Sequence, residues 1–371
     1  MPKLVDLYDR HGQSPWLDDL RRSWLLDGTL ARRLERGVRG ITSNPSIFQK
    51  AMADGSAYDE QFAALAKDGC SAVRSYWAMA TSDVADALDL LAPLYRDSGG
   101  GDGFVSLELA PELAHDTEAS VEAARRFHTD IARPNLLVKI PATDEGVPAV
   151  QRLIAQGASI NVTLIFGLER YAEVMEAYLS GLEELEAHEA GAASLSRVHS
   201  VASFFISRVD VEIDRRLEAI GSPEALELRG RAAVAQAKLA YRAFRQTFSG
   251  PRWEALEAKG ARVQRPLWAS TSTKNPDYPD TLYVDSLIGP DTVNTMPVAT
   301  LEAFEDRGTV AATAEDGAEE AQALLGRLED LGIDVDDVSR VLEDEGVAAF
   351  AKSFDQGIDA LADKAAALAQ R

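Results

Sequence analysis

Cysteine, long apolar runs and positive charge are all scarce in this sequence. Cys70 is the only cysteine, which excludes an internal disulfide and a zinc site built on paired thiolates, and is typical of a reducing compartment. No stretch approaches the roughly 18 apolar residues that a membrane span needs, and the N-terminal segment MPKLVDLYDRHG has no apolar signal core. We therefore expect a cytoplasmic protein without a membrane partner.

Negative charge dominates the composition. The 60 Asp and Glu residues outnumber the 38 Lys and Arg residues, so the formal net charge is -22 at pH 7. Because the average field of such a protein repels phosphate backbones and anionic lipid, we expect no nucleic-acid partner. With 46% hydrophobic and 26% charged residues, the chain has the composition of a folded globular protein. Its 371 residues allow two domains or one enlarged α/β barrel.

Short apolar or β-branched runs alternate with longer helical patterns along the chain. The eight expected strands are SPWLDDL from Ser14, GVRGITSN from Gly37, FVSLELA from Phe104, NLLVKIPAT from Asn135, ASINVTLIF from Ala158, RVHSVASFFIS from Arg197, RPLWAST from Arg265 and DTVNTMP from Asp291. This alternation indicates a parallel sheet, and eight β/α units favour a closed (β/α)8 TIM barrel. No Gly-rich dinucleotide fingerprint follows the first strand, which disfavours an open doubly wound sheet.

Two segments exceed a minimal barrel. The connection from Pro45 to Gly103 holds enough helix-forming sequence for several helices before the GGGDG break, and helical sequence follows from 298 to 371. Since no Pro/Ser-rich linker separates these segments, we expect residues 1–371 to form a single domain, with 298–371 as a C-terminal helical extension.

Polar side chains alternate with apolar ones in three neighbouring expected strands. In a barrel, alternate side chains point inward and the others pack against the helices. The expected helix-facing set is Val105, Leu107, Leu109, Leu136, Val138, Ile140, Ile160, Val162 and Leu164. The expected inward set is Ser106, Glu108, Lys139, Ser159, Asn161 and Thr163, while Asp18, Thr42, Asn44 and Ser203 end other strands. These polar residues gather at the C-terminal ends of the strands, where barrel active sites lie.

Lys139 is the most informative of these residues. Among the lysines it alone lies within a buried-strand pattern, where an amine is rarely tolerated unless it is paired or used. Burial disfavours the charged form of an amine and so yields the neutral nucleophile of Schiff-base chemistry. The alternative is a structural ion pair between Lys139 and Glu108, although buried pairs stabilise weakly.

Three other polar residues have both chemical and structural interpretations. Asp18 could be catalytic, or Asp18 or Asp19 could cap the helical sequence that follows it. Glu108 could act as a general acid or base, or only pair with Lys139. Thr163 and Asn161 could satisfy each other as ordinary buried polar groups.

Cations follow the sixth and seventh expected strands. Arg208 lies in SFFISRVD, where a guanidinium can chelate phosphate, and Lys274 lies in STSTKNP beside several hydroxyls. Barrel phosphate sites are commonly built from these late loops, whereas the alternative is a solvated surface cation. The five histidines show no ligand-like pairing, so we expect no metal, and no motif indicates a cofactor.

Five motifs resemble those of the transaldolases of the pentose phosphate pathway: GITSNPSIF, VSLELAPELAHDTEAS, NLLVKIPATDEGVPA, INVTLIF and SFFISRVD. WASTSTKNP is similar to the longer bacterial subgroup. The resemblance implies that Lys139 forms the Schiff base, that Asp18 exchanges a proton with the C4 hydroxyl, and that Glu108 and Thr163 orient a catalytic water. It further implies a dihydroxyacetone-binding set of Thr42, Asn44, Asn161 and Ser203.

The same resemblance makes Arg208 the main phosphate ligand and Phe205 an aromatic residue of the cavity. Other subgroups have a second arginine after the seventh strand, where this sequence reads STSTKNP. In this comparison Ser270 aligns, and phosphate contact by Lys274 in place of the arginine is a hypothesis. The implied reaction transfers dihydroxyacetone from a ketose phosphate (sedoheptulose 7-phosphate or fructose 6-phosphate) to an aldose phosphate (glyceraldehyde 3-phosphate or erythrose 4-phosphate). The implied partners are sugar phosphates only.

Two other functions remain open at this point. A true aldolase would release free dihydroxyacetone, but relatives with that activity carry a tyrosine where this chain has Phe205. A non-catalytic sugar-phosphate-binding barrel would have lost its catalytic set, yet Asp18, Glu108, Lys139 and Thr163 are all present. The sequence does not distinguish a monomer from a homodimer.

Overall fold

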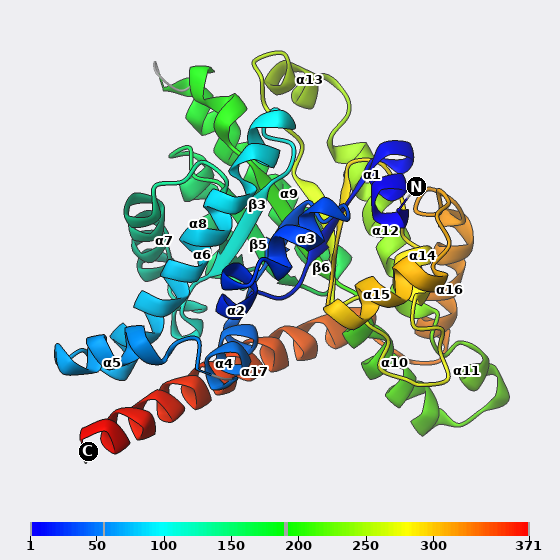
Figure 1. The fold of residues 1–371 in the computed structure, drawn as a ribbon. Helices are drawn as coiled ribbons and strands as arrows, with labels where there is room; N and C mark the ends of the chain where they lie inside the picture. Colours follow the sequence, from blue (N-terminus) through cyan, green and yellow to red (C-terminus); the bar gives the residue numbers. More distant parts are fainter. Residues whose placement is uncertain (1, 55, 189–191, 370–371) are drawn as a thin grey trace.

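Eight parallel strands close into a barrel in the computed structural model, which describes residues 2–54, 56–188 and 192–369 (Figure 1). The strands are β1 (Gln13–Leu17), β2 (Gly40–Thr42), β3 (Phe104–Glu108), β4 (Leu136–Pro141), β5 (Ile160–Ile165), β6 (Ser200–Phe205), β7 (Arg265–Ala269) and β8 (Thr292–Met296). They follow one another in chain order and β8 pairs with β1. The expected (β/α)8 barrel and its eight strands are confirmed.

Helices connect the strands as the alternating pattern predicts. They are α1 (Lys3–His11), α2 (Arg22–Leu26), α3 (Thr29–Glu35), α4 (Pro45–Ala53), α5 (Asp59–Lys67), α6 (Ala72–Asp97), α7 (Thr117–Ile131), α8 (Gly146–Ile154), α9 (Leu168–Ala187), α10 (Ser207–Ile220), α11 (Pro223–Glu227), α12 (Ala232–Thr247), α13 (Pro251–Glu257), α14 (Leu282–Asp285), α15 (Val298–Arg307), α16 (Ala318–Asp330) and α17 (Val335–Ala369). Two 3₁₀ turns, η1 (Pro111–Leu113) and η2 (Ala192–Arg197), complete the set. No helix of the described ranges is both long and apolar enough to cross a membrane.

The strand register places the predicted inward residues beside one another. Glu108 of β3 pairs with Lys139 of β4, and Lys139 pairs with Asn161 of β5. The apolar residues of these strands are almost completely buried against the helices, as the alternation predicts. Alternation therefore brings a carboxylate, an amine and an amide together at one level of the barrel.

The alternation fails at Leu164, which the pattern placed against the helices. The β5–β6 register shifts between Val162 and Ile165, and Leu164 has a left-handed φ of 58°. This bulge turns the strand, so that Leu164 lines a small hollow with Glu108 and Phe350 instead. The prediction for this one residue was wrong because a bulge resets the side-chain alternation.

Helix α17 crosses the C-terminal ends of the strands, which we call the mouth of the barrel (Figure 1). It packs against α4, α6, α10 and β5. Gly346 allows the close approach, because a Cβ atom there would lie 3.0 Å from Leu164 and 3.5 Å from the guanidinium of Arg208. Farther along α17, the ring centroids of Phe354 and Tyr76 lie 5.0 Å apart. The helical extension thus helps to enclose the mouth.

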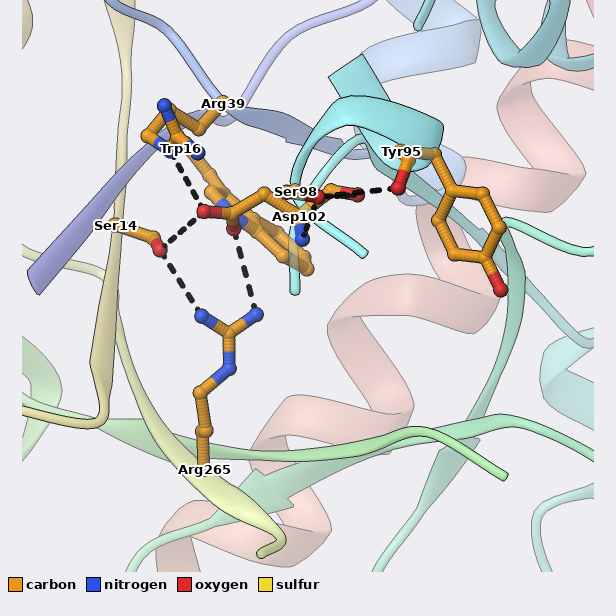
Figure 2. Close-up of polar contacts among 7 residues, drawn as sticks. All are labelled: Ser14, Trp16, Arg39, Tyr95, Ser98, Asp102 and Arg265. Atoms are coloured by element: carbon orange, nitrogen blue, oxygen red, sulfur yellow. Dashed lines mark hydrogen bonds and ion pairs between the residues drawn. The ribbon is translucent and has the colours of Figure 1, made fainter. Parts of the chain in front are cut away.

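A buried carboxylate closes the opposite end of the barrel, which we call the floor (Figure 2). Asp102, immediately before β3, accepts hydrogen bonds from Ser14 Oγ at 2.8 Å and Trp16 Nε1 at 3.2 Å. Arg39 Nε donates to it at 2.6 Å and Arg265 Nη2 at 3.4 Å. Because these donors come from β1, from the residue before β2 and from β7, Asp102 connects three parts of the floor.

Candidate active site

Lys139 and Glu108 form an ion pair inside the mouth of the barrel. Lys139 Nζ lies 3.3 Å from Glu108 Oε2, and each side chain is only 5% exposed. Burial raises the pKa of Glu108, while the ammonium of Lys139 opposes that rise. The structural ion pair considered from the sequence therefore exists, and it places a proton donor or acceptor beside the amine.

Asp18 begins a chain of hydroxyl contacts that runs to β8. Thr42 Oγ1 donates a hydrogen bond to Asp18 Oδ1 at 2.7 Å, and Thr295 Oγ1 lies 2.6 Å from Thr42 Oγ1. Since Thr42 has one proton and gives it to Asp18, Thr295 is the donor in the second contact. Burial raises the pKa of Asp18, although the charge of Lys139 and the hydrogen bond from Thr42 partly oppose this rise. The N-cap residue of α2 is Arg21, and neither Asp18 nor Asp19 caps this helix, so the capping alternative is wrong.

A second polar chain lies across β3, β5 and β6. Ser203 Oγ donates to Asn161 Oδ1 at 2.7 Å, and Asn161 Nδ2 donates to Ser106 Oγ at 3.0 Å. The alternative in which Asn161 and Thr163 satisfy each other does not occur, because Asn161 uses both ends of its amide on serines. This arrangement fixes the orientation of the Asn161 amide in the barrel interior.

Two buried oxygens of the mouth accept no regular hydrogen bond from the described residues, although one of them lies 3.3 Å from Lys139 Nζ in the ion pair. They are Glu108 Oε2 and Thr163 Oγ1. Buried oxygens of this kind are costly unless a ligand or a solvent molecule uses them. Their position makes them the polar groups of the mouth that are available to a reacting molecule.

Asn44 lies where β2 turns into α4. Its Oδ1 accepts a hydrogen bond from Ile47 N at 3.0 Å, so the residue caps the helix. The cap occupies the amide oxygen and fixes the side chain at the mouth. Asn44 therefore combines a structural role with a position suitable for substrate contact.

Arg208 is the best placed cation for a phosphate group. It is the second residue of α10, its guanidinium lies 5.4 Å from the Phe205 ring and 5.9 Å from the Phe350 ring, and burial lowers its pKa. Lys274 is exposed and donates to Ser272 Oγ at 2.6 Å. Burial and the charge of Arg208 lower the pKa of Lys274, which indicates two neighbouring cations. Neither cation has a carboxylate within salt-bridge distance among the described residues.

Ser270 connects the loop after β7 to the start of α10. Ser270 has a left-handed φ of 55°, its carbonyl accepts a bond from Ser207 N at 3.1 Å, and its Oγ lies 2.9 Å from Ser207 Oγ. Strained backbone of this kind is often retained at ligand sites. The contact holds the Ser270–Lys274 segment next to Arg208.

Two tyrosines that follow Lys274 in the chain donate hydrogen bonds to carboxylates of α10. Tyr278 donates to Asp214 Oδ2 at 2.6 Å, and Tyr283 donates to Asp210 Oδ2 at 2.8 Å. Burial raises the pKa of Asp210 to about 6. These bonds restrict the position of the loop that carries Lys274.

Sequence reasoning did not include two residues of the mouth. Thr295 could have been identified, because it is a hydroxyl at the C-terminal end of an expected strand, as Thr42 is. Phe350 carried no such signal: in α17 it has the spacing of an ordinary core residue, yet its ring lies 5.9 Å from both Lys139 Nζ and Arg208 Cζ. Only the path of α17 across the mouth explains its position.

The structure brings ten of the twelve expected residues together through contacts at the mouth or beside it. Those ten are Asp18, Thr42, Glu108, Lys139, Asn161, Ser203, Phe205, Arg208, Ser270 and Lys274. Asn44 and Thr163 lie at the ends of β2 and β5 beside them. In the parts of the chain that the structure describes, no group of three or more His, Cys, Asp or Glu residues could hold a metal ion.

Similarity to known proteins extends along nearly the whole chain. The family model for transaldolase/fructose-6-phosphate aldolase matches residues 15–361. A transaldolase of Mycobacterium tuberculosis is 51% identical over 348 residues, covering 93% of this chain and 92% of that relative. Transaldolases of Mycolicibacterium smegmatis (53% over 351 residues, 94% of each chain) and Thermobifida fusca (50% over 358 residues, 96% of each) are similar to the same extent. The matched region includes every residue of the mouth, from Asp18 to Phe350.

Proposed function

The chain belongs to the transaldolase/fructose-6-phosphate aldolase family, and we propose that it transfers dihydroxyacetone between sugar phosphates through a Schiff base on Lys139. The observation that carries the proposal is the buried Lys139 amine, 3.3 Å from Glu108, at the end of the barrel where active sites lie. Donor and acceptor are a ketose phosphate, such as sedoheptulose 7-phosphate or fructose 6-phosphate, and an aldose phosphate, such as glyceraldehyde 3-phosphate or erythrose 4-phosphate.

The first step forms the imine. The neutral Lys139 amine attacks the C2 carbonyl of the ketose phosphate, and the resulting carbinolamine loses water as the C=N bond forms. The leaving hydroxyl needs a proton, which Glu108 can supply because burial favours its protonated form. Thr163 Oγ1, a buried oxygen without another hydrogen-bond partner among the described residues, can orient the water molecule involved.

The second step breaks the carbon chain. Asp18 removes the proton of the C4 hydroxyl, the C3–C4 bond breaks, and its electron pair moves into the protonated imine to give an enamine on Lys139. The aldose phosphate leaves with the former C4 as its aldehyde carbon. When Asp18 becomes protonated, it can donate to Thr42, and Thr42 can in turn donate to Thr295, so the chain of hydroxyls reverses without breaking.

The acceptor completes the cycle. Arg208, with Lys274 beside it, binds the phosphate of the incoming aldose. The enamine carbon attacks the aldehyde, Asp18 returns its proton to the new C4 hydroxyl, and hydrolysis of the imine releases the product and the Lys139 amine. Thr42, Asn44, Asn161 and Ser203 are the proposed contacts of the dihydroxyacetone unit.

Transfer and simple aldol cleavage differ in the fate of the enamine, because an aldolase protonates it and releases dihydroxyacetone. The Phe205 ring lies 5.0 Å from that of Phe166 and beneath the Arg208 guanidinium, and it brings no hydroxyl to organise water. Phe350 adds a second apolar ring near Lys139. Both rings support transfer, since a dry enamine persists until an acceptor arrives.

Borohydride trapping tests the Schiff base. The protein is incubated with fructose 6-phosphate, reduced and digested, and the modified peptide is identified by mass spectrometry. We expect the adduct on Lys139, its loss in Lys139→Ala, and its retention in Lys259→Ala, which changes a surface lysine paired with Glu186. Unlabelled wild-type protein, or an adduct on another lysine, contradicts the proposal.

A product assay separates transferase from aldolase. With fructose 6-phosphate as donor, we expect sedoheptulose 7-phosphate to form only when erythrose 4-phosphate is present, with little free dihydroxyacetone. Predominant release of dihydroxyacetone would instead assign the aldolase activity. The net charge of -22 fits the proposed partners, small sugar phosphates of the cytoplasm rather than nucleic acid, because only a local positive mouth is needed.

A further inference from the structure

A second cavity lies at the floor of the barrel, at the opposite ends of the strands from Lys139. Its volume is about 480 Å³, which is within the range of small-molecule sites. Arg262, Arg265 and His199 line it, together with apolar side chains that include Phe104 and Val201. The cavity therefore offers both cationic groups and an apolar wall.

The guanidinium groups at this cavity and beside it have few carboxylate partners. Arg39 and Arg265 share a single buried carboxylate, that of Asp102 (Figure 2). Arg262 donates to the carbonyl oxygens of Gly99 at 2.7 Å and Ser196 at 3.4 Å, and no carboxylate lies within salt-bridge distance of it among the described residues. Among the described residues, Asp102 is thus the only carboxylate within salt-bridge distance of any of these three guanidinium groups.

His199 is an uncharged lining residue near the same arginines. Burial, together with the charges of Arg262 and Arg265, lowers its pKa to about 3. Its Nε2 lies 3.2 Å from Tyr95 Oη. Two exposed carboxylates, Asp9 and Asp291, also line the cavity, but neither lies within salt-bridge distance of these arginines in the described part of the chain. Because the imidazole is neutral, the cationic groups that line the cavity are the guanidinium groups of Arg262 and Arg265.

We propose that the floor cavity binds a small phosphorylated metabolite, whose phosphate contacts Arg262 and Arg265 and whose organic part lies against Phe104 and Val201. A guanidinium presents two parallel N–H groups that match the oxygens of a phosphate. The N–H groups of Arg262 donate to neutral carbonyl oxygens, and a charged phosphate oxygen is a stronger acceptor than a carbonyl oxygen. The site is separate from the catalytic mouth, because Phe104 begins β3 and Val201 lies at the start of β6, whereas Glu108 ends β3 and Arg208 follows β6.

Calorimetric titration with glycerol 3-phosphate tests this proposal, because the probe lacks a carbonyl and cannot react with Lys139. We expect the wild-type protein to bind two molecules, one at the mouth and one at the floor. Arg208→Gln should keep only the floor site, and Arg262→Gln should keep only the mouth site. In each variant the affinity for the probe at the altered site should fall by at least about tenfold. Arg229→Gln, which changes an exposed arginine paired with Glu218, should bind as the wild type does.

The result in Arg208→Gln is decisive, because it measures the floor without the catalytic phosphate site. If that variant binds no glycerol 3-phosphate, or if Arg262→Gln binds as much as the wild type, the floor site is refuted while the Schiff-base proposal is untouched. Hydrogen exchange of the unmodified protein gives a second measurement that needs no variant to fold. Protection by the probe should include residues 99–101 and 262–265, and protection confined to residues 205–208 contradicts the proposal.

Discussion

The buried carboxylates at the two ends of the barrel differ in how many hydrogen bonds they accept from the protein. At the floor, Asp102 accepts hydrogen bonds from Ser14, Trp16, Arg39 and Arg265. At the mouth, Glu108 Oε2 has only the ion-pair contact with Lys139 Nζ at 3.3 Å among the described residues, and Asp18 has a single side-chain donor, Thr42. The floor carboxylate is saturated and stabilises the fold, whereas the mouth carboxylates keep free acceptor capacity for a substrate.

This difference determines how each end responds to pH. Burial raises the folded-state pKa of Asp18 and Glu108 above that of the unfolded chain. In the interval between the unfolded and folded pKa values, the folded protein holds protons that the unfolded chain releases, so the free energy of unfolding falls as pH rises through that interval. The mouth carboxylates therefore reduce stability at neutral pH, and function accounts for their presence.

The largest expected effect comes from Asp18→Asn. Loss of the base that accepts the C4 proton should lower kcat by about 10²- to 10⁴-fold. Because the asparagine removes a buried charge, the midpoint of thermal unfolding at pH 7 should be equal to or higher than that of the wild type. Steady-state transfer assays and thermal unfolding measure the two quantities. A variant that is both active and less stable than the wild type would contradict the functional role assigned to the mouth carboxylates.

Asp102→Asn should show the reverse pattern. It leaves the guanidinium groups of Arg39 and Arg265 buried without their carboxylate, which should lower the free energy of unfolding by roughly 3 kcal/mol. The kcat per folded molecule should change less than about twofold, since no mouth residue contacts Asp102. Urea unfolding measures the loss of stability, and a large fall in kcat at low temperature would show that floor and mouth are coupled.

A smaller effect is expected at Thr295, which reaches Asp18 only through Thr42. Thr295→Val removes one hydrogen bond, worth about 1 kcal/mol, so kcat should fall by about five- to tenfold with little change in KM. Thr295→Ser keeps the hydroxyl and should restore most of the activity. Equal activity of the valine and serine variants would contradict the positioning role of this hydroxyl.

The smallest expected effect is a shift of the pH profile. Asp18 must be ionised to accept a proton, so kcat/KM should decline as pH falls, at a pH above the ordinary range of an aspartate because burial raises its pKa. Thr42→Val removes a hydrogen bond that lowers this pKa, so the acid limb should move to higher pH. An unchanged acid limb in this variant would show that another group controls it.

The sequence was most informative where side-chain alternation and chemistry coincide. Lys139 and Glu108 could be paired from strand alternation alone, since β-strand geometry is local and repetitive. The bulge at Leu164 could not be predicted, because one residue with positive φ depends on the packing of α17 above it. The Asn161 bonds to Ser106 and Ser203 and the position of Phe350 depend on contacts between distant segments, which alternation does not encode. The single-domain organisation and the chemical roles of individual residues stay predictions.

The pairing of β1 with β8 has a consequence for how the protein is made. A ribosome delivers Gln13–Leu17 long before Thr292–Met296, so the first strand has one edge without its partner during most of synthesis. Asp18, Thr42 and Thr295 cannot form their chain of hydroxyls until that late pairing occurs. The Phe350 ring of α17 is added later still. The mouth is therefore complete only after β8 and α17 have been synthesised, and a nascent chain that already contains Lys139 still lacks part of the site.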